Sequence, residues 1–522
     1  MSDAAAARTA WLAFALIAIA GVLLRPAMPI DETRYLSVAW EMWLSGDWLV
    51  PSKNFEIYTH KPPLLFWAIN AVWSITGVSE IAARLIGPAF AVLTILLTGR
   101  LSRRLWPDDT GAGSQAVLAL SGMLLFAFYG GLTMFDAALA AATVGAMLAL
   151  LHAVETDRGR DWTLLGVATA AGVLAKGPVI LVHVAPAMLL VPLWAGRARI
   201  SLRRLAIGSG LAMVVALAVV SLWLVPAILA GGAEYRDAVL WTQSAGRMAD
   251  SFAHGRPWWF FVALLPALLF PWVLMPGLWR SAIRADWREP GLRLCLVWAG
   301  SALVIFSLIS GKQAHYLVPE LSAAALIVAR LARTPGRLGV IFATIPVLVL
   351  ATAGAAVTAG LLPIGKAADL LHPQSILVAW VLFAVAVCWL AIRLSGLRGG
   401  AVLSLGVILS FDLAIGLTDS GEIYDTHGIA SAVAAQERNG IAFYGQTYHA
   451  EFNFAGRLSR SVANPTSEAE LAGWLAANPE GVVIARPDRT SPGWQPRQTI
   501  LFRNSPYAIW HVADLPVMEP RT

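Results

Sequence analysis

The chain has 522 residues, of which 58% are hydrophobic and only 13% are charged, whereas soluble chains carry roughly a quarter charged residues. This composition excludes an ordinary soluble domain and indicates a membrane protein. The formal net charge is +6, but the arginines are spread through short loops between apolar runs and form no contiguous basic domain. A nucleic-acid partner is therefore not expected.

Apolar runs recur from Trp11 to Leu417 and predict about thirteen membrane spans, because one crossing needs about 20 apolar residues. The first run, 11–24, is interpreted as a retained span, since no small-residue cleavage pattern follows it. Both cysteines, Cys295 and Cys388, lie within apolar runs. Neither a disulfide framework nor a cysteine metal site is expected.

Arginine clusters follow every second predicted span, and cytoplasmic loops carry such an excess of positive charge. The alternation predicts a bacterial inner-membrane protein with a cytoplasmic N-terminus, and thirteen spans then place the C-terminus in the periplasm. The clusters are Arg100, Arg103 and Arg104; Arg158 and Arg160; Arg197, Arg199, Arg203 and Arg204; Arg280, Arg284, Arg288 and Arg293; Arg330, Arg333 and Arg337; and Arg393 and Arg398.

The first outer loop, 29–82, is rich in Trp, Tyr and charge. Its segments 33–44 and 62–75 have the apolar spacing of helices that lie along the membrane interface. The loop begins with the acids Asp31 and Glu32, followed by Arg34. Acids at a membrane boundary are costly unless they are used or paired. Either a salt bridge to Arg34 or a carboxylate that accepts a proton from, or orients, an acceptor hydroxyl explains them.

The same loop contains Tyr58, His60 and Lys61 directly before the double proline Pro62-Pro63. Proline is favoured in a first helical turn, so Lys61 is expected beside a helix N-terminus, where an anion is stabilised. The sequence thus predicts a phosphate contact at Lys61. The alternative is a turn that merely anchors the loop.

All five lysines fall on the predicted outer face, against the topology rule for positive charge. An anionic ligand at that face explains their placement, and lysines that snorkel at span ends are the alternative. They are Lys53, Lys61, Lys176, Lys312 and Lys366.

Further along the chain, three outer segments carry residues capable of chemistry. Asp136 lies in a very short turn, and Lys176 precedes Gly177-Pro178. Residues 231–257 contain Arg247 and His254, and the hinge 310–319 offers Lys312, His315 and Tyr316, which are a cation, an imidazole and a phenol, within five residues.

After about residue 419 the apolar runs shorten to strand length, with polar turns between them. Ser467 and Glu470 have capping-box spacing before a helical segment at 469–477. The expected fold is an all-α polytopic membrane domain at 1–418, which includes the periplasmic loop 29–82 with its interfacial helices. A small periplasmic α/β domain at 419–522 is expected to follow.

Taken in this order, the acid pair, the Lys-Pro-Pro, the short-turn Asp, the Lys-Gly-Pro and the Lys-x-x-His-Tyr-x-x-Pro resemble the membrane glycosyltransferases with the C-type fold. More specifically, they are similar to the 4-aminoarabinose lipid A transferase and protein mannosyltransferase-like family. The resemblance implies transfer of a sugar, with inversion, from a polyprenyl-phosphate carrier to a lipid or other envelope acceptor at the periplasmic face.

The resemblance also implies roles for individual residues. The catalytic candidates are Asp31, its neighbour Glu32 and Asp136. The candidates for the carrier-phosphate site are Lys61, Arg34, Tyr35, Tyr58 and Tyr316, joined by Lys312 and Arg247. Further candidates near the same pocket are His60, Lys176, His254 and His315.

One position departs from the family pattern. Relatives in the aminoarabinose branch often have an acid directly before the Lys-Pro-Pro lysine, where this chain has His60. A pocket that pairs with an amino sugar would miss that acid, which favours a neutral or acidic sugar. No cluster has metal-ligand spacing, and whether a divalent metal assists is open, as are the identities of sugar and acceptor.

Two other functions compete with this hypothesis. A secondary transporter or lipid flippase also has many spans, but such proteins bind near the bilayer midplane, at the interface of internal repeats. Here the ionisable residues collect at one membrane face, and the sequence has no visible repeat. The other alternative is a catalytically inactive envelope-assembly protein with the same fold.

Overall fold

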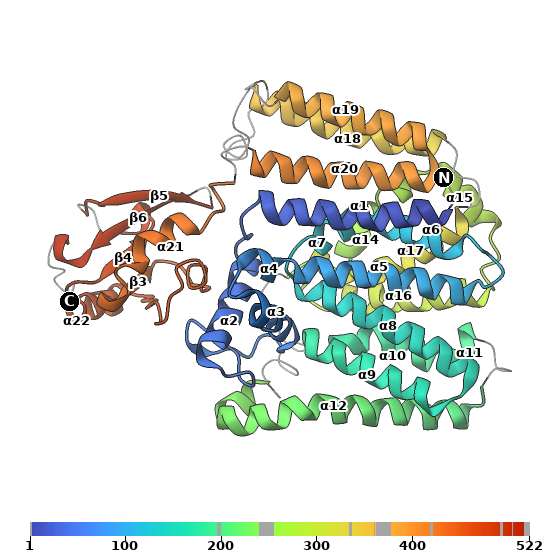
Figure 1. Cartoon of the computed structure of the whole chain (residues 1–522), viewed down its shortest axis with the longest axis horizontal. Helices are drawn as coiled ribbons and strands as arrows, with labels where there is room; N and C mark the ends of the chain where they lie inside the picture. Colours follow the sequence, from blue (N-terminus) through green and yellow to red (C-terminus); the bar gives the residue numbers. More distant parts are fainter. Residues whose placement is uncertain are drawn as a thin grey trace.

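The computed structural model describes residues 3–195, 200–239, 255–332, 337–359, 361, 377–417, 421–490, 494–503 and 505–515. Long apolar helices lie side by side and make up most of the molecule (Figure 1). They are α1 (Asp3–Leu24), α5 (Ile86–Leu105), α6 (Ala112–Ser121), α7 (Leu124–Gly130), α8 (Phe135–Thr156), α9 (Gly159–Lys176), α10 (Ile180–Leu189), α11 (Val191–Trp194), α12 (Leu202–Asp237), α14 (Phe260–Leu268), α15 (Pro276–Arg284), α16 (Pro290–Leu308), α17 (Glu320–Leu331), α18 (Arg337–Thr358), α19 (Leu377–Leu394) and α20 (Gly396–Gly416).

Among the described residues, eight helices are long and apolar enough to cross a membrane. A ninth crossing is added if α6 and α7, which are bent by 72° relative to each other, form one broken span. The protein is therefore a mostly helical, multi-span membrane protein. The finer expectation of thirteen spans stays a prediction.

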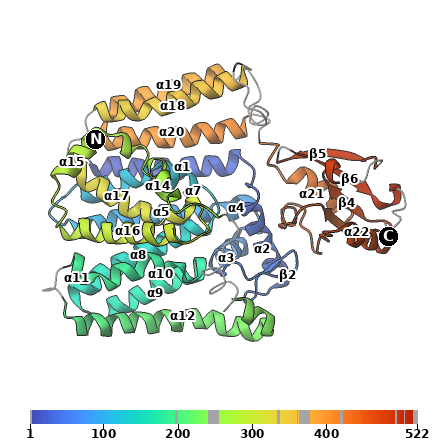
Figure 2. The same ribbon diagram turned by 180° about the vertical axis from the view of Figure 1, so that it is seen from behind.

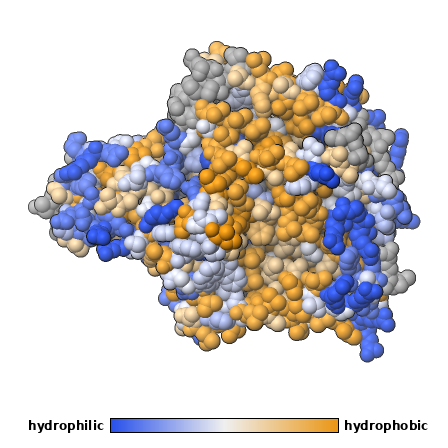
Figure 3. Space-filling view, viewed as in Figure 1, coloured by the Kyte–Doolittle hydropathy of each residue, from blue (hydrophilic) through white to orange (hydrophobic). Residues whose placement is uncertain are grey.

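The outer surface of the helical part is apolar, as contact with lipid requires. Figure 3 shows a broad hydrophobic band across the helices, bordered by hydrophilic residues at the end opposite the sheet. On α12, for example, Leu222 and Leu229 are 78% and 79% exposed. Such fully exposed leucines would be unfavourable in water and are favourable in a bilayer.

The first outer loop folds into a compact unit at one end of the helices. It contains α2 (Asp31–Ser45), the short antiparallel pair β1 (Ser52–Lys53) and β2 (Glu56–Ile57), α3 (Leu64–Thr76) and α4 (Glu80–Arg84). Helices α2 and α3 lie where the apolar spacing predicts them. They pack through fully buried side chains such as Leu36, Met42, Leu65 and Phe66, which fixes the orientation of the acids at the start of α2.

The C-terminal segment forms a four-stranded sheet in the order β3-β4-β6-β5 with two helices. Strands β3 and β4 are parallel, and the other neighbours are antiparallel. The elements are α21 (His427–Ala434), β3 (Ile441–Tyr444), α22 (Glu468–Ala477), β4 (Val482–Ala485), β5 (Gln498–Phe502) and β6 (Ser505–His511). As the capping-box spacing predicts, Ser467 accepts a hydrogen bond from the Glu470 amide, 3.2 Å away.

The C-terminal segment packs on the first outer loop, at the same end of the helices (Figures 1 and 2). The Ser37 hydroxyl donates to the Ala450 carbonyl at 2.6 Å, and the Asn54 side chain exchanges two 2.8 Å hydrogen bonds with the Val462 backbone. The Trp73 and Phe454 rings stack at 5.5 Å. These contacts join chain segments far apart in sequence into one wall above the ends of the helices.

Candidate active site

The N-terminus of α2 presents a carboxylate to an open cavity. Asp31 pairs with the Arg34 guanidinium and accepts a hydrogen bond from the Tyr35 hydroxyl at 3.1 Å. Its side chain is nevertheless 44% exposed. Asp31 thus forms the predicted salt bridge to Arg34 and is still accessible from the cavity.

The cavity has a volume of about 430 Å³, which is within the usual range for small-molecule sites. Its walls come from the start of α2, the segment before α8, the start of α14 and the hinge before α17. The lining residues are Met28, Pro29, Asp31, Glu32, Tyr129, Leu132, Met134, Arg256, Phe260, Lys312, Gln313, Ala314 and His315. The sequence pattern did not single out Arg256 or Phe260, since one arginine beside an aromatic run carries no specific signal.

Glu32, the neighbour of Asp31, is held between two arginines. Its carboxylate lies 2.9 Å from Arg25 and 3.9 Å from Arg84, and it accepts hydrogen bonds from the amides of Met28 at 3.0 Å and Thr133 at 2.8 Å. Burial raises the pKa of Glu32, but the two guanidinium groups and these amides outweigh burial and lower it to about 2. Glu32 therefore ties the start of α2 to the segment that leads to Asp136.

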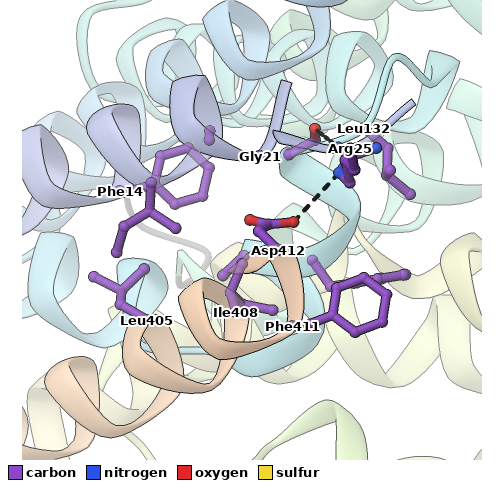
Figure 4. Close-up of a pocket in the computed structure, with 13 residues that line it drawn as sticks. Phe14, Gly21, Arg25, Leu132, Leu405, Ile408, Phe411 and Asp412 are labelled. Carbon is purple, nitrogen blue, oxygen red and sulfur yellow. Dashed lines mark hydrogen bonds and ion pairs between the residues drawn. The ribbon is translucent and has the colours of Figure 1, made fainter. Parts of the chain in front are cut away.

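Arg25 extends this network to α20. Figure 4 shows the Asp412 side chain reaching from α20 toward Arg25, with 3.3 Å between Asp412 Oδ1 and Arg25 Nε. The crevice beside this pair has about 20 Å³ of space, which is room for about one water molecule. The network ties the start of α2 and α20 to the segment that follows α1, and Glu32 also lines the larger cavity.

We expect Glu32→Gln to destabilise the protein by about 3 to 5 kcal/mol, because two buried arginines lose their shared counter-charge. Thermal unfolding of the detergent-solubilised protein measures this, with Glu56→Gln on the exposed strand β2 as control. Because the pKa is lowered from 4.5 to about 2, the contribution is present above about pH 4.5 and is lost as the pH falls through about 2. Equal unfolding temperatures of parent and Glu32→Gln protein at pH 7 would contradict the structural role.

A second carboxylate, Asp136, lies at the start of α8 and is buried. Lys176 Nζ is 2.5 Å from Asp136 Oδ1 and lies 5.0 Å from the centre of the Tyr316 ring. Lys61 Nζ lies 5.6 Å from the ring centre of Phe135, the residue before Asp136. The structure thus brings four of the sequence-predicted motifs to one place.

His315 lies among these groups, and the charges of both carboxylates and both lysines act on its ring. Its ring is 5.1 Å from Tyr316 and 5.8 Å from Tyr129. Burial is the largest cause that lowers the pKa of His315 to about 4; Lys176 and Lys61 lower it further, while Asp136 and Asp31 oppose them. The imidazole is therefore neutral at pH 7, so one ring nitrogen can donate a hydrogen bond and the other can accept one.

Arg34, Tyr35, Tyr58 and His60 belong to the first outer loop, and the ring centre of Tyr35 lies 4.7 Å from that of Phe135. Burial lowers the pKa of Arg34, but Tyr35, Tyr58 and Asp31 outweigh burial and raise it. The rings of Tyr58 and His60 stack with 5.4 Å between their centres. The Nε atom of Arg34 is buried and has no hydrogen-bond partner within the described residues.

Lys312 is held differently from the other lysines. It is 3% exposed, and its Nζ donates to the carbonyl oxygens of Arg256, at 3.0 Å, and of Ile309. These bonds occupy two of the three donors of the Lys312 ammonium, which lines the cavity. Arg247, His254 and Lys366 lie outside the described residues.

The C-terminal segment also faces this site, which no sequence motif predicts. Burial is the main cause that lowers the pKa of His449 to about 4; Lys53, Arg34 and Arg503 lower it further, and Asp31 opposes them. Across all described residues, no group of three or more His, Cys, Asp or Glu side chains is arranged to hold a metal ion.

Sequence comparisons agree with the motifs. The family model described as dolichyl-phosphate-mannose-protein mannosyltransferase matches residues 60–225. Proteins named undecaprenyl phosphate-alpha-4-amino-4-deoxy-L-arabinose arabinosyl transferase are similar to the chain. The one from Pseudomonas paraeruginosa is 33% identical over 57% of this chain and 54% of its own length. The one from Pectobacterium carotovorum is 27% identical, over 76% of this chain and 72% of its own length. The 33%-identical match thus spans about half of that relative.

Structural comparisons cover nearly the whole chain. ArnT from Cupriavidus metallidurans, solved with bound undecaprenyl phosphate, matches with a TM-score of 0.72 and 20% identity, over 96% of this chain and 97% of that one. The oligosaccharyltransferase of Archaeoglobus fulgidus matches with a TM-score of 0.54 and 14% identity, over 92% of this chain and 69% of that one. The resemblance inferred from the motifs is therefore confirmed, and the chain has the C-type fold of these membrane glycosyltransferases.

Proposed function

We propose that this protein is an inverting glycosyltransferase that moves a sugar from a polyprenyl-phosphate carrier to lipid A, lipopolysaccharide or another envelope acceptor. One observation carries the proposal: an accessible carboxylate and a cluster of cations meet at one end of a membrane-embedded bundle. The relatives' names, which specify transfer from undecaprenyl phosphate, support the same carrier.

The carrier phosphate would bind among the cations and hydroxyl groups of the site. Arg34, Tyr58 and Lys61 come from the first outer loop, and Tyr316 comes from the hinge before α17. As the bond between the sugar and the phosphate breaks, negative charge grows on the leaving phosphate. Fixed cations and hydroxyl donors stabilise that charge, and one such contact is typically worth about 2.7 to 4 kcal/mol of barrier.

The acceptor oxygen would attack the anomeric carbon from the side opposite the phosphate. A new carbon–oxygen bond forms, the bond to the phosphate breaks, and the carrier leaves as polyprenyl phosphate. If the acceptor is a hydroxyl, Asp31 takes its proton, since this carboxylate is the accessible one. Asp136 would hold Lys176 in place, and Glu32 would fix α2 through its arginines.

The membrane topology is part of the proposal: a cytoplasmic N-terminus, a periplasmic site, thirteen spans and an inner-membrane location. The chain turns at Gly177, whose φ is +78°. A Cβ at Gly172 would lie 2.5 Å from Ile180, and this close approach of α9 and α10 supports their assignment as separate crossings. The thirteen crossings would be α1, α5, α6 with α7, α8, α9, α10 with α11, α12, α14, α16, α17, α18, α19 and α20.

Ion pairs at the end opposite the site support this orientation. Arg104 pairs with Glu155 at 2.7 Å, and Arg330 pairs with Glu289 at 2.8 Å. The basic loops therefore gather at one end, which the positive-inside rule assigns to the cytoplasm. The proposed division is a transmembrane domain at 1–418, with the periplasmic loop at 29–82, and a periplasmic α/β domain at 419–522.

The donor sugar is proposed to be neutral or acidic. His60 takes the position before Lys61 where the aminoarabinose branch often has an acid, and it stacks on Tyr58 beside the site. A ring at this position offers a flat surface to a sugar and no counter-charge to an amine.

A deletion strain tests this function in the cell. Mass spectrometry of lipid A and envelope polysaccharide from the deletion strain and its parent should show the loss of one sugar unit from one glycolipid. Complementation with the parent gene should restore that mass, and an Asp31→Asn gene should not. Identical glycolipid masses in deletion strain and parent would overturn the proposal.

A further inference from the structure

His183 and Glu320 form a buried pair that no step of the proposed reaction uses. His183 lies on α10, Glu320 is the first residue of α17, and His183 Nδ1 contacts Glu320 Oε1. The two side chains are 0% and 7% exposed. His183 Nε2 and Glu320 Oε2 are buried and have no hydrogen-bond partner in the part of the chain that the structure describes. Ionisable groups inside a membrane bundle are costly and call for a functional explanation.

The pair joins the two segments that carry Lys176 and Tyr316. Lys176 ends α9, and the chain turns at Gly177 directly into the helix that contains His183. Tyr316 lies in the short 3-10 helix (Ala314–Leu317) that leads into the helix beginning at Glu320. A link between His183 and Glu320 therefore limits how far Lys176 and Tyr316 can separate.

An aromatic ring provides a second connection. Phe306, near the end of α16, has its ring centre 5.4 Å from that of His183 and 5.7 Å from that of Tyr316. Lys176 Nζ lies over the Tyr316 ring at 5.0 Å. A shift of His183 would thus be passed to Tyr316 through one closely packed ring, because cores transmit displacements.

We propose that His183 and Glu320 are positioning residues that hold Lys176 and Tyr316 in contact for the carrier phosphate. This inference rests on the proposed function, in which Tyr316 binds that phosphate. A displacement of about 1 Å in a positioned group lowers a rate about 100-fold. The loss is expected in kcat more than in KM, because the phosphate charge grows only as the bond breaks.

The double variant His183→Leu with Glu320→Leu tests the proposal. A single substitution leaves one buried polar group unpaired and can prevent folding, whereas replacing both partners by apolar residues is often neutral for stability. We expect an unfolding temperature close to that of the parent, a donor KM little changed, and a kcat lowered about 100-fold. Ser322→Ala, which alters a buried residue on the same helix α17, should keep the parent kcat.

A cryo-electron microscopy structure of the double variant gives a readout that does not depend on activity. We expect Lys176 to leave the Tyr316 ring. A double variant with the parent kcat, or with Lys176 still over that ring, would overturn the positioning role. If the parent protein transfers no sugar, the proposed function fails separately, and the distance between Lys176 and Tyr316 in the variant still decides this inference.

Discussion

Asp31→Asn is expected to abolish sugar transfer while the protein still folds and inserts. Asparagine keeps the shape of the side chain and can still accept hydrogen bonds from Arg34 and Tyr35, which contact Asp31. It cannot accept a proton from an acceptor hydroxyl, and positioned proton transfer contributes about 100- to 10,000-fold to a rate. Turnover of a polyprenyl-phosphate sugar by the purified variant measures the loss.

Asp47→Asn is the matched control for this change. Asp47 is an exposed carboxylate just after α2 that accepts a hydrogen bond from the Leu49 amide at 2.8 Å. The same substitution there should leave turnover near the parent value. Near-normal transfer by the Asp31→Asn protein would remove Asp31 from the reaction.

Lys61→Ala is expected to lower kcat/KM by about 100- to 1000-fold, which corresponds to about 2.7 to 4 kcal/mol of barrier for one lost electrostatic contact. Lys61 lies over the Phe135 ring, and its charge acts on both Asp136 and His315. Without it, the leaving phosphate loses a cation inside a partly buried site, where charge is poorly screened by water.

Arg236→Ala removes a charge of the same sign at the site end of α12, where Arg236 forms an exposed pair with Asp237. Exposed pairs contribute little energy, so this control should transfer sugar at the parent rate. If Lys61→Ala and Arg236→Ala behave alike, the carrier phosphate does not bind at Lys61.

The residues that the sequence motifs single out lie close together in the structure, although they are far apart in the sequence. Asp31, Lys61, Asp136, Lys176 and Tyr316 come from separate outer segments, and the structure places them around one region. This was predictable because the outer loops of a membrane bundle have little room, so polar residues at the ends of neighbouring spans meet. Family motifs in the right order added the expected roles.

The partners of these residues were not predictable. Glu32 and Asp31 are adjacent acids, yet only Glu32 is held between Arg25 and Arg84, because the helix turns it inward. Lys312 is another example, since a lysine in a polar hinge suggests an anion contact, and its two bonds to the backbone carbonyls of Arg256 and Ile309 could not be predicted from the sequence. Side-chain direction in a hinge depends on packing that no local pattern encodes.

The contacts between the C-terminal segment and the first outer loop were equally unpredictable from the sequence. Glu41 on α2 accepts hydrogen bonds from the amides of Asn54 at 2.7 Å and Phe55 at 2.8 Å and from the Asn453 side chain at 3.1 Å. Glu41 and Asn453 are more than 400 positions apart in the chain. Contacts between residues so far apart in the chain follow from the fold as a whole. The helix cap at Ser467 depends on four neighbouring residues, and its prediction from the sequence is confirmed.

The central claim is tested most directly with the purified protein in liposomes that contain one undecaprenyl-phosphate sugar and a lipid A acceptor. Donors with a neutral, an acidic and an amino sugar are compared, and mass spectrometry follows both the glycosylated lipid and the released undecaprenyl phosphate. We predict that the neutral or the acidic donor gives equal amounts of the two products, that the anomeric configuration is inverted, and that the Asp31→Asn protein gives neither product. Release of no undecaprenyl phosphate from any donor, or equal transfer by the Asp31→Asn protein, would contradict the account.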